Sequence, residues 1–397
     1  MTKSIFTLWF LLIAGSGWTA TSYVDGNLLS NCTSGNYSIS NRSCTGSDGD
    51  AWRTIFEGLN DTNIAGDVLN IREGIYPERI ESGSQTIVSG TSWENPVTIQ
   101  GHASEVVTLR PTYGDVVIQV NTPSQGNSTR YVVFKNLIVD ATNTNFGVAI
   151  GGGNNGGTVD HIKLDGLEVK NAIGDAVLIG GPHGGGDSSW LTDVKIHNNG
   201  TAGDGHGLYV ESSNNIVEYS EIYNQSGYGI HNYAGSASNN IYRYSTIYGN
   251  GTNLGRIAWG ILVTTGGNNQ IYGNVIVNNQ NGVTSGSEGN QILNNTIYGN
   301  GINLPCRTVC DSAIQLSNSA NTVVRNNIVF GNFRDNIEAS GDRGTVSSSN
   351  LQSDPSFVDV ANNDFRLLPG SAAIGNGTSS IPEIGAPFGL RSQRTPE

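Results

Sequence analysis

The stretch NNIVEYSEIYN at residues 214–224 is followed by NNIYRYSTIYGN at residues 239–250, and this repetition decides the fold. Each stretch carries an apolar residue at its fourth position and another one five residues later. The same offset recurs in pairs that follow one another at steps of 21 to 31 residues. The pairs are Val133 and Ile138, Ile162 and Leu167, Leu191 and Ile196, Val217 and Ile222, Tyr242 and Ile247, Ile271 and Ile276, Ile292 and Ile297, and Val323 and Ile328. A fixed offset within a variable spacing indicates strands of constant length joined by loops of changing length.

A second apolar strand follows in each repeat, after a glycine or another small residue. Examples are FGVAIGG at 146–152, HGLYVES at 206–212 and WGILVTT at 259–265. Apolar residues alternate with other residues in these stretches, which is the period of a strand and not of a helix.

One polar position also recurs, three residues after the first apolar position of each pair. It holds Asn136, Asp165, Ser220, Ser245, Asn274, Asn295 and Asn326, and only Val194 departs from the pattern. Polar side chains at one register of stacked strands can bond along the stack, so we expect an asparagine ladder here.

These repeats predict an all-β fold, a single-stranded right-handed parallel β-helix with about ten coils. The sequence resembles the pectin-lyase-like superfamily of secreted carbohydrate-active proteins over about Ile55 to Phe365. We expect a capping helix over the amphipathic stretch AWRTIFEGLN at residues 51–60, because an open end of the stack leaves backbone groups unpaired. The predicted segments are a signal peptide at 1–20, an N-terminal segment at 21–54, the β-helix at 55–366 and a C-terminal capping tail at 367–397.

Charge and the first twenty residues indicate where the protein acts. Residues 1–20 combine Lys3 with a short apolar run and small residues, which is typical of a secretory signal peptide. The net charge of −13 over 397 residues disfavours nucleic acid and anionic membrane surfaces as partners. We therefore predict a secreted protein that is not membrane-bound in its mature form, with a polysaccharide as partner. End-to-end stacking of copies is a further option for such a solenoid.

Four cysteines in an exported chain predict disulfides. Of the three connectivities, we favour Cys32 with Cys44 and Cys306 with Cys310, because the two pairs are remote from each other in sequence. A metal site is the alternative for the second pair, but no histidine lies near it, so no metal site is predicted.

Ten Asn-x-Ser/Thr sites are candidates for N-glycosylation on a eukaryotic secretory route. They are Asn31, Asn36, Asn41, Asn60, Asn127, Asn199, Asn224, Asn250, Asn294 and Asn376.

Candidate functional residues gather on the outer face of the second strand. Stacking places equivalent residues of neighbouring coils about 5 Å apart, so Tyr209 should lie beside His231 and Glu211 beside Tyr233. The corner before the strand carries Asp175, His206, Tyr228, Trp259 and Asn281 on successive coils. Whether His206 points outward depends on the turn that Gly205 and Gly207 make. The alternative interpretation, that these are ordinary corner residues without a catalytic role, also stays open.

Loops on both sides of this face add further candidates. We expect Tyr233 and Trp259 to stack on sugar rings, and Asp204, His183 and Arg256 to bind substrate, with Arg256 near a sugar carboxylate.

GHGL at residues 205–208 resembles the Gly-His-Gly motif of polygalacturonases. The other motifs of that family are missing: only Asp175 stands for its aspartate pair, and HNY at 231–233 replaces its Arg-Ile-Lys. Hydrolysis by Asp175, Asp204 and Glu211 is therefore kept as an alternative.

The leading prediction is a polysaccharide lyase, or an epimerase that uses the same first step, acting on a polymer containing uronic acids. His206 or His231 would be the base and Tyr209 or Tyr228 the acid. No cofactor is required by these residues. Ca²⁺, which many pectate lyases use, stays open, although the clustered aspartates of those families are absent. A non-catalytic β-helix that binds glycan or assembles into a surface structure is the third hypothesis.

Overall fold

The structure is a computed structural model, and it describes residues 21–62, 64–81, 87–122, 128–152, 157–181, 184–201, 203, 205–253, 255–304, 313–340 and 344–378. The predicted signal peptide, Cys306, Cys310 and Asn127 lie outside the described residues, as do His183 and Asp204.

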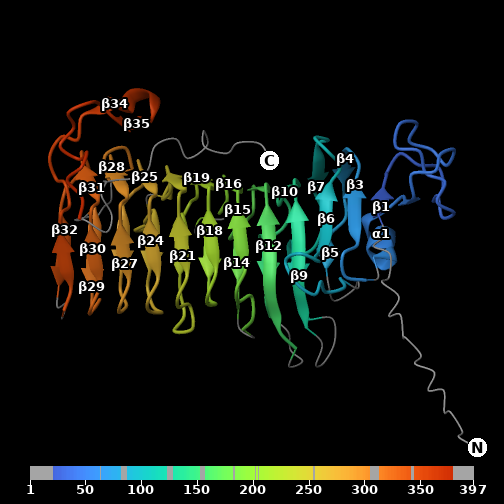
Figure 1. Ribbon diagram of the computed structural model, residues 1–397, viewed down its shortest axis with the longest axis horizontal. Coiled ribbons are helices and arrows are strands. Elements are labelled where there is room, and N and C mark those ends of the chain that lie inside the picture. Colours follow the sequence, from blue (N-terminus) through green and yellow to red (C-terminus); the bar gives the residue numbers. More distant parts are fainter. Residues whose placement is uncertain are drawn as a thin grey trace, which may run out of the picture.

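Three long sheets of parallel strands run side by side along the molecule, with one strand of each sheet in nearly every coil (Figure 1). The first sheet contains, in spatial order, β2 (Asp50–Trp52), β1 (Thr21–Val24), β3 (Val68–Ile71), β6 (Val97–Gly101), β9 (Thr129–Lys135), β12 (Val159–Asp165), β15 (Trp190–Thr192), β18 (Ile216–Glu218), β21 (Ile241–Arg243), β24 (Gln270–Tyr272), β27 (Gln291–Leu293), β30 (Val323–Arg325) and β33 (Val346–Ser348).

The second sheet follows the first after a short turn in each coil. It contains β4 (Gly74–Tyr76), β7 (Val107–Leu109), β10 (Ile138–Asp140), β13 (Glu168–Lys170), β16 (Lys195–His197), β19 (Glu221–Tyr223), β22 (Thr246–Tyr248), β25 (Val275–Val277), β28 (Thr296–Tyr298) and β31 (Ile328–Phe330).

The third sheet carries the predicted functional face. It contains β5 (Ile80–Glu81), β8 (Val116–Val120), β11 (Phe146–Ile150), β14 (Val177–Ile179), β17 (Leu208–Val210), β20 (Ile230–Asn232), β23 (Ile261–Val263), β26 (Val283–Ser285), β29 (Ile314–Ser317) and β32 (Ile337–Ser340). The predicted fold class, a right-handed parallel β-helix, is confirmed.

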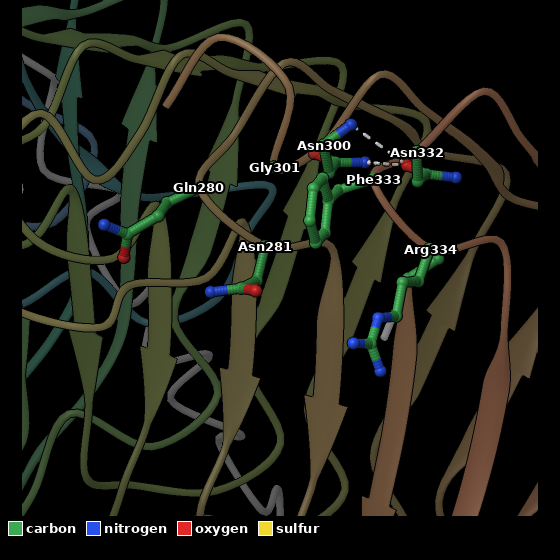
Figure 2. Close-up of a pocket in the computed structure, with 8 residues that line it drawn as sticks. Gln280, Asn281, Asn300, Gly301, Asn332, Phe333 and Arg334 are labelled. Carbon is green, nitrogen blue, oxygen red and sulfur yellow. Dashed lines mark hydrogen bonds between the residues drawn. The ribbon is translucent and has the colours of Figure 1, made fainter. Parts of the chain in front are cut away.

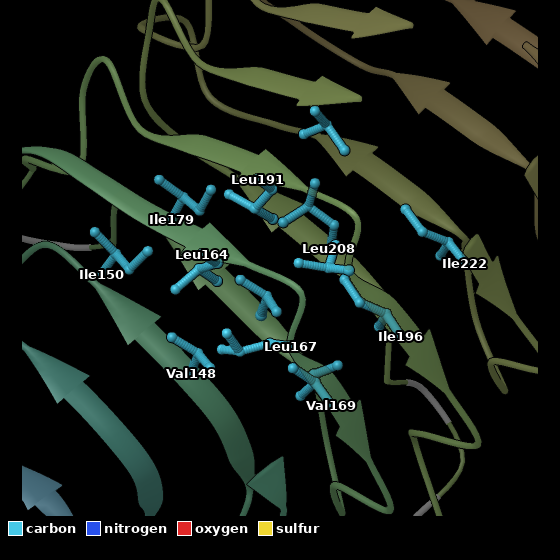
Figure 3. Packing of buried hydrophobic residues seen from close by; sticks show 14 of the residues in the cluster. Val148, Ile150, Leu164, Leu167, Val169, Ile179, Leu191, Ile196, Leu208 and Ile222 are labelled. Atoms are coloured by element: carbon cyan, nitrogen blue, oxygen red, sulfur yellow. The ribbon is translucent and has the colours of Figure 1, made fainter. Parts of the chain in front are cut away.

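Inward side chains of all three sheets form one continuous apolar core (Figure 3). On the third sheet Val177, Leu208, Ile230 and Ile261 face one another in register and are fully buried. The prediction for the second strand of each repeat therefore had the right register.

The first strand of each repeat was aligned correctly only in the middle of the chain. Leu191 pairs with Val217 as predicted, but its other neighbour is Leu164 and not Ile162. Phe134 and Val324 likewise stand where Val133 and Val323 were expected. In β9 the apolar residues Val132, Val133 and Phe134 are consecutive, and in β12 Ile162 and Leu164 lie two positions apart, so the pattern fits the sequence at more than one register.

The polar ladder exists, but it begins later than predicted. Hydrogen bonds link Ser220, Ser245, Asn274, Asn295 and Asn327 from coil to coil. In the earlier coils the corrected register puts Leu137, Leu167 and Val194 at this corner, so Asn136 and Asp165 are not part of it, and Asn327 replaces Asn326.

Two further ladders lie at the other turns. The first links Asn215, Asn240, Asn269 and Asn290. The second links Asn199, Gln225, Asn250, Asn279, Asn300 and Asn332. Because Asn199 and Asn250 are 2% and 0% exposed, they cannot carry glycans in the folded protein, which corrects two of the predicted glycosylation sites.

At the N-terminal end the helix is shorter than predicted, and the sheet starts earlier. α1 (Ile55–Asp61) begins after its N-cap Thr54, since residues 50–52 form β2 instead. Ile55 and Leu59 extend the core. Because β1 and β2 already belong to the first sheet, the sheet begins at Thr21 and not at the predicted boundary of residue 55.

The C-terminal region leaves the stack after β33. It forms an antiparallel pair, β34 (Phe357–Asp359) and β35 (Asp364–Leu367), joined by the short helix η1 (Val360–Asn362). Phe357 and Phe365 pack against Tyr298 of β28, so this region covers part of the second sheet.

The disulfide between Cys32 and Cys44 is confirmed, with an S–S distance of 2.10 Å. In the part of the chain that the structure describes, no helix is long and apolar enough to cross a membrane.

Candidate active site

Tyr209 and His231 lie side by side on the outer face of the third sheet. They occupy the middle positions of β17 and β20, which pair in register, and their ring centroids are 4.9 Å apart. Their inward neighbours Leu208 and Ile230 are fully buried, and this anchors the strands so that both rings point outward.

His206 reaches the same face from the corner of the coil. Its backbone N–H donates to Asp175 Oδ1 at 2.7 Å, and its ring lies 5.1 Å from that of His231. The turn depends on glycines, because a Cβ on Gly205 would lie 2.0 Å from the carbonyl oxygen of Gly174. The turn thus brings His206 to the outer face, the condition that the sequence had left open.

Two tyrosines complete the cluster. The ring of Tyr228 lies 4.6 Å from that of His206 and 4.8 Å from that of His231. Tyr233 stacks on Tyr209 at 5.9 Å with an interplanar angle of 18° and is 43% exposed. Tyr233 therefore offers a ring surface to a ligand in solution.

Trp259 does not offer such a surface. It occupies the predicted corner position beside Tyr228, as the bond from the Gly229 N–H to the Trp259 carbonyl oxygen shows. Trp259 is only 6% exposed, which corrects the expectation that it stacks on a sugar. Arg256, in the loop that precedes it, is exposed.

Both histidines are neutral at neutral pH. Desolvation lowers the pKa of His231 to about 4. Desolvation also lowers the pKa of His206 to about 3, with repulsion from His231 and Arg256 contributing. Arg256 therefore lies close enough to the cluster for its positive charge to lower the pKa of His206.

The acidic groups shift in the opposite direction. Desolvation raises the pKa of Asp175 to about 6, and the negative charge of Glu211 adds to this, although the His206 N–H opposes it. Desolvation, together with the charge of Glu211 and a hydrogen bond to it, raises the pKa of Tyr209 well above its usual range. Tyr209 is therefore a protonated donor at neutral pH.

The two imidazoles differ in what their nitrogens can do. Nδ1 of His206 accepts a hydrogen bond from the Tyr228 backbone N–H at 3.2 Å, and a backbone N–H cannot reverse that role. Nε2 of His231 lies 3.0 Å from Oγ1 of Thr264, a hydroxyl that can either donate or accept. Only His231 can therefore offer Nε2 as a proton acceptor without losing a backbone bond.

Thr264 is the residue that the sequence reasoning missed. The signal that could have found it is its position diagonal to His231 on the next coil, within reach of a long side chain.

The donor set does not fit a dedicated calcium site. Ca²⁺ takes six to eight oxygen ligands. Over the described residues no group of three or more His, Cys, Asp or Glu side chains is placed to hold a metal ion. Asp175 and Glu211 are the described carboxylates of the cluster, so no step of the mechanism is assigned to calcium.

A small pocket further along the stack is too small for a sugar (Figure 2). It lies at the turns around Asn281, Asn300 and Asn332, with Phe333 and Arg334 at its edge. Its volume of about 10 Å³ is close to that needed by a single water molecule. This pocket is therefore not a candidate active site.

Comparison with known proteins identifies the fold of this chain. Residues 118–297 match the family described as "Right handed beta helix region". The chain has the fold of a right-handed parallel β-helix. Comparison with curated protein sequences gives no significant match.

Solved structures with this β-helix fold share little sequence with the chain. "Crystal structure of pectate lyase Pel9A" matches with a TM-score of 0.65 and 18% identity, covering 93% of this chain and 96% of that one. Geobacillus virus E2 ORF18 matches with a TM-score of 0.51 and 13% identity over 75% and 55% of the chains. An alginate lyase from Paenibacillus sp. str. FPU-7 matches with a TM-score of 0.49 and 17% identity over 76% and 95%. At these identities the likeness shows the fold alone.

Proposed function

We propose that the protein is a secreted polysaccharide lyase that cleaves a uronic-acid-containing polymer by β-elimination. The observation that carries the proposal is a neutral imidazole, His231, beside a protonated phenol, Tyr209, on the adjacent coil. Export is part of the proposal, and the disulfide between Cys32 and Cys44 is in keeping with it.

In the proposed reaction Nε2 of His231 removes the proton at C5 of a uronic acid residue. The electron pair of the C–H bond forms a double bond between C4 and C5, and the bond between C4 and its oxygen breaks. Tyr209 donates its phenolic proton to that leaving oxygen. The exposed guanidinium of Arg256 pairs with the sugar carboxylate and makes the C5 proton more acidic.

The placement of the two groups favours elimination over epimerisation. An epimerase removes the C5 proton from one face of the sugar and returns a proton to the opposite face. His231 and Tyr209 project from the same face of one sheet, so both approach the sugar from the same side. The fold likeness to a pectate lyase agrees with this proposal but does not carry it.

Glycoside hydrolysis is the second candidate, and one observation favours it. Asp175, whose pKa is raised to about 6, interacts electrostatically with Glu211. A protonated carboxylic acid near a second carboxylate is the pairing that glycoside hydrolases use for acid and base.

Product analysis separates the two candidates. The protein is incubated with a panel of uronic-acid polymers and neutral polysaccharides, and both reducing ends and unsaturated ends that absorb ultraviolet light are measured. The proposal expects the two kinds of end to appear in equal amounts from one or more of the uronic-acid polymers. Reducing ends without ultraviolet absorption would establish hydrolysis instead, and the absence of any product would favour a glycan-binding β-helix without catalytic activity.

The pH dependence of the reaction gives a further prediction. A base must be neutral, and the pKa of His231 is about 4, so kcat/KM should stay constant from neutral pH down to about pH 5 and fall only as the pH approaches 4. An ordinary histidine would already lose activity below about pH 6.5. The check is kcat/KM measured between pH 3.5 and about 8. A rate that instead falls as the pH rises through about 6 would assign the acid role to Asp175 and favour the hydrolase.

A further inference from the structure

A groove of about 330 Å³ lies on the outer face of the first sheet, on a different sheet from the candidate active site. Its floor is formed by outward residues of β3, β6, β9, β12 and β15, among them Lys135, Lys163 and Trp190. Trp93 enters from the turn before β6, which a bridge between Ser92 and Asn95 closes. We call this surface the tryptophan groove.

The two tryptophan rings stand at right angles and are held in place. Their centroids are 6.3 Å apart with an interplanar angle of 81°. Nε1 of Trp190 donates to Oε1 of Glu218 at 3.0 Å, and Nζ of Lys163 lies 4.1 Å from the centre of the Trp190 ring. Trp93 also packs edge-on against Tyr131 at 5.4 Å. A ligand would therefore meet rings that are already positioned.

One positive charge in the groove is not balanced. Lys163 pairs with Asp165 at 3.0 Å, and Glu218 pairs with Arg243 at 2.6 Å. Lys135 makes no ion pair or hydrogen bond with any residue that the structure describes. The chain is strongly acidic and carries only four lysines after residue 20, yet two of them lie here.

We propose that the tryptophan groove is a second carbohydrate-binding site, which holds a chain of acidic sugars. The apolar faces of sugar rings stack on indole rings, and a sugar carboxylate would pair with Lys135. The groove crosses five strands, which is roughly 19 Å at the usual spacing between strands and leaves room for several sugar units. Binding at this groove does not require the active-site proposal to hold.

The test measures binding without turnover, so every protein in it carries His231→Ala, which removes the proposed base. Hexameric oligogalacturonate, oligomannuronate and oligoglucuronate are titrated separately into this full-length protein, with the groove intact or substituted, at low ionic strength, and affinity and stoichiometry are read by calorimetry. At least one of these acidic hexamers should bind when the groove is intact. Adding Trp93→Ala or Lys135→Ala should weaken that binding about tenfold, and added salt should weaken it when the groove is intact.

Lys195→Ala is the matched control, because Lys195 lies on β16 of the second sheet, away from the groove. It removes the same charge and should leave binding unchanged. Lys135→Glu keeps a long polar side chain at a solvent-accessible position, so it should reverse the charge without unfolding the protein. It should abolish binding of the acidic hexamers at the groove. Equal binding with the groove intact and with either groove substitution would overturn the proposal. So would a neutral hexasaccharide that binds as tightly as the acidic hexamers, or a complete lack of binding when the groove is intact.

Discussion

Replacing His231 by alanine is expected to lower kcat for β-elimination about a thousandfold, because a positioned base contributes a factor of about 10² to 10⁴. Nε2 of His231 is hydrogen-bonded only to a hydroxyl, that of Thr264, so it can accept a proton without losing a backbone bond. The same substitution should lower the melting temperature only slightly, since the side chain is partly exposed and its only hydrogen bond to a described residue is the one to Thr264. Initial rates of unsaturated-end formation and thermal unfolding provide the two measurements.

His197→Ala is the matched control for this prediction. His197 is also a partly buried histidine on an outer face, but it lies on β16, where it stacks on Tyr223 at 4.9 Å. Its removal should leave kcat within about twofold of the wild type, because no group of the candidate site contacts it. Equal losses in the two variants would mean that the His231 effect is structural.

The second large effect is expected on stability, at Asn279 in the middle of a ladder. Oδ1 of Asn279 accepts from the backbone N–H and Nδ2 of Asn250, at 3.1 and 2.8 Å. Nδ2 of Asn279 donates to the Ile247 carbonyl oxygen and to Oδ1 of Asn300, at 2.9 and 3.0 Å. Alanine removes all four bonds and leaves their partners buried. At about 1 kcal/mol for each buried hydrogen bond that is lost, Asn279→Ala should lower the free energy of unfolding by about 4 kcal/mol.

The control is Asn143→Ala, at an exposed asparagine whose side chain donates to the Pro111 carbonyl oxygen. Its effect should stay below about 1 kcal/mol, since water replaces the lost partner. Denaturant unfolding, followed by circular dichroism, measures both variants. A destabilisation by Asn279→Ala no greater than that by Asn143→Ala would contradict the role assigned to the ladder.

The register of the third sheet could be predicted because glycines mark each corner. Gly207, Gly229 and Gly260 precede the first inward residues of β17, β20 and β23, and a side chain at any of them would collide with the next coil. The first sheet has no such marker. Val133 and Phe134 of β9 are adjacent apolar residues, and Ile162 and Leu164 of β12 are alternate ones, so two registers satisfy the pattern and the sequence alone could not choose between them.

The candidate site was predictable only where it follows the strand period. Tyr209, His231 and Tyr233 alternate with core residues, so their shared face could be read from the sequence. The burial of Trp259 could not, because a corner residue lies outside the strand alternation that separates inward from outward side chains. The tryptophan groove was also beyond sequence reasoning, since it joins Trp93 to Trp190 across about a hundred residues and three coils.

The central claim is that His231 and Tyr209, on neighbouring coils, act together in one chemical step. A double-mutant cycle tests it most directly, with kcat for elimination measured for the wild type, His231→Ala, Tyr209→Phe and the double variant. If proton removal and protonation of the leaving oxygen belong to one step, the double variant should be about as slow as the slower single variant. If the loss of kcat in the double variant instead equals the product of the losses in the two single variants, as for independent sites, the account would be contradicted.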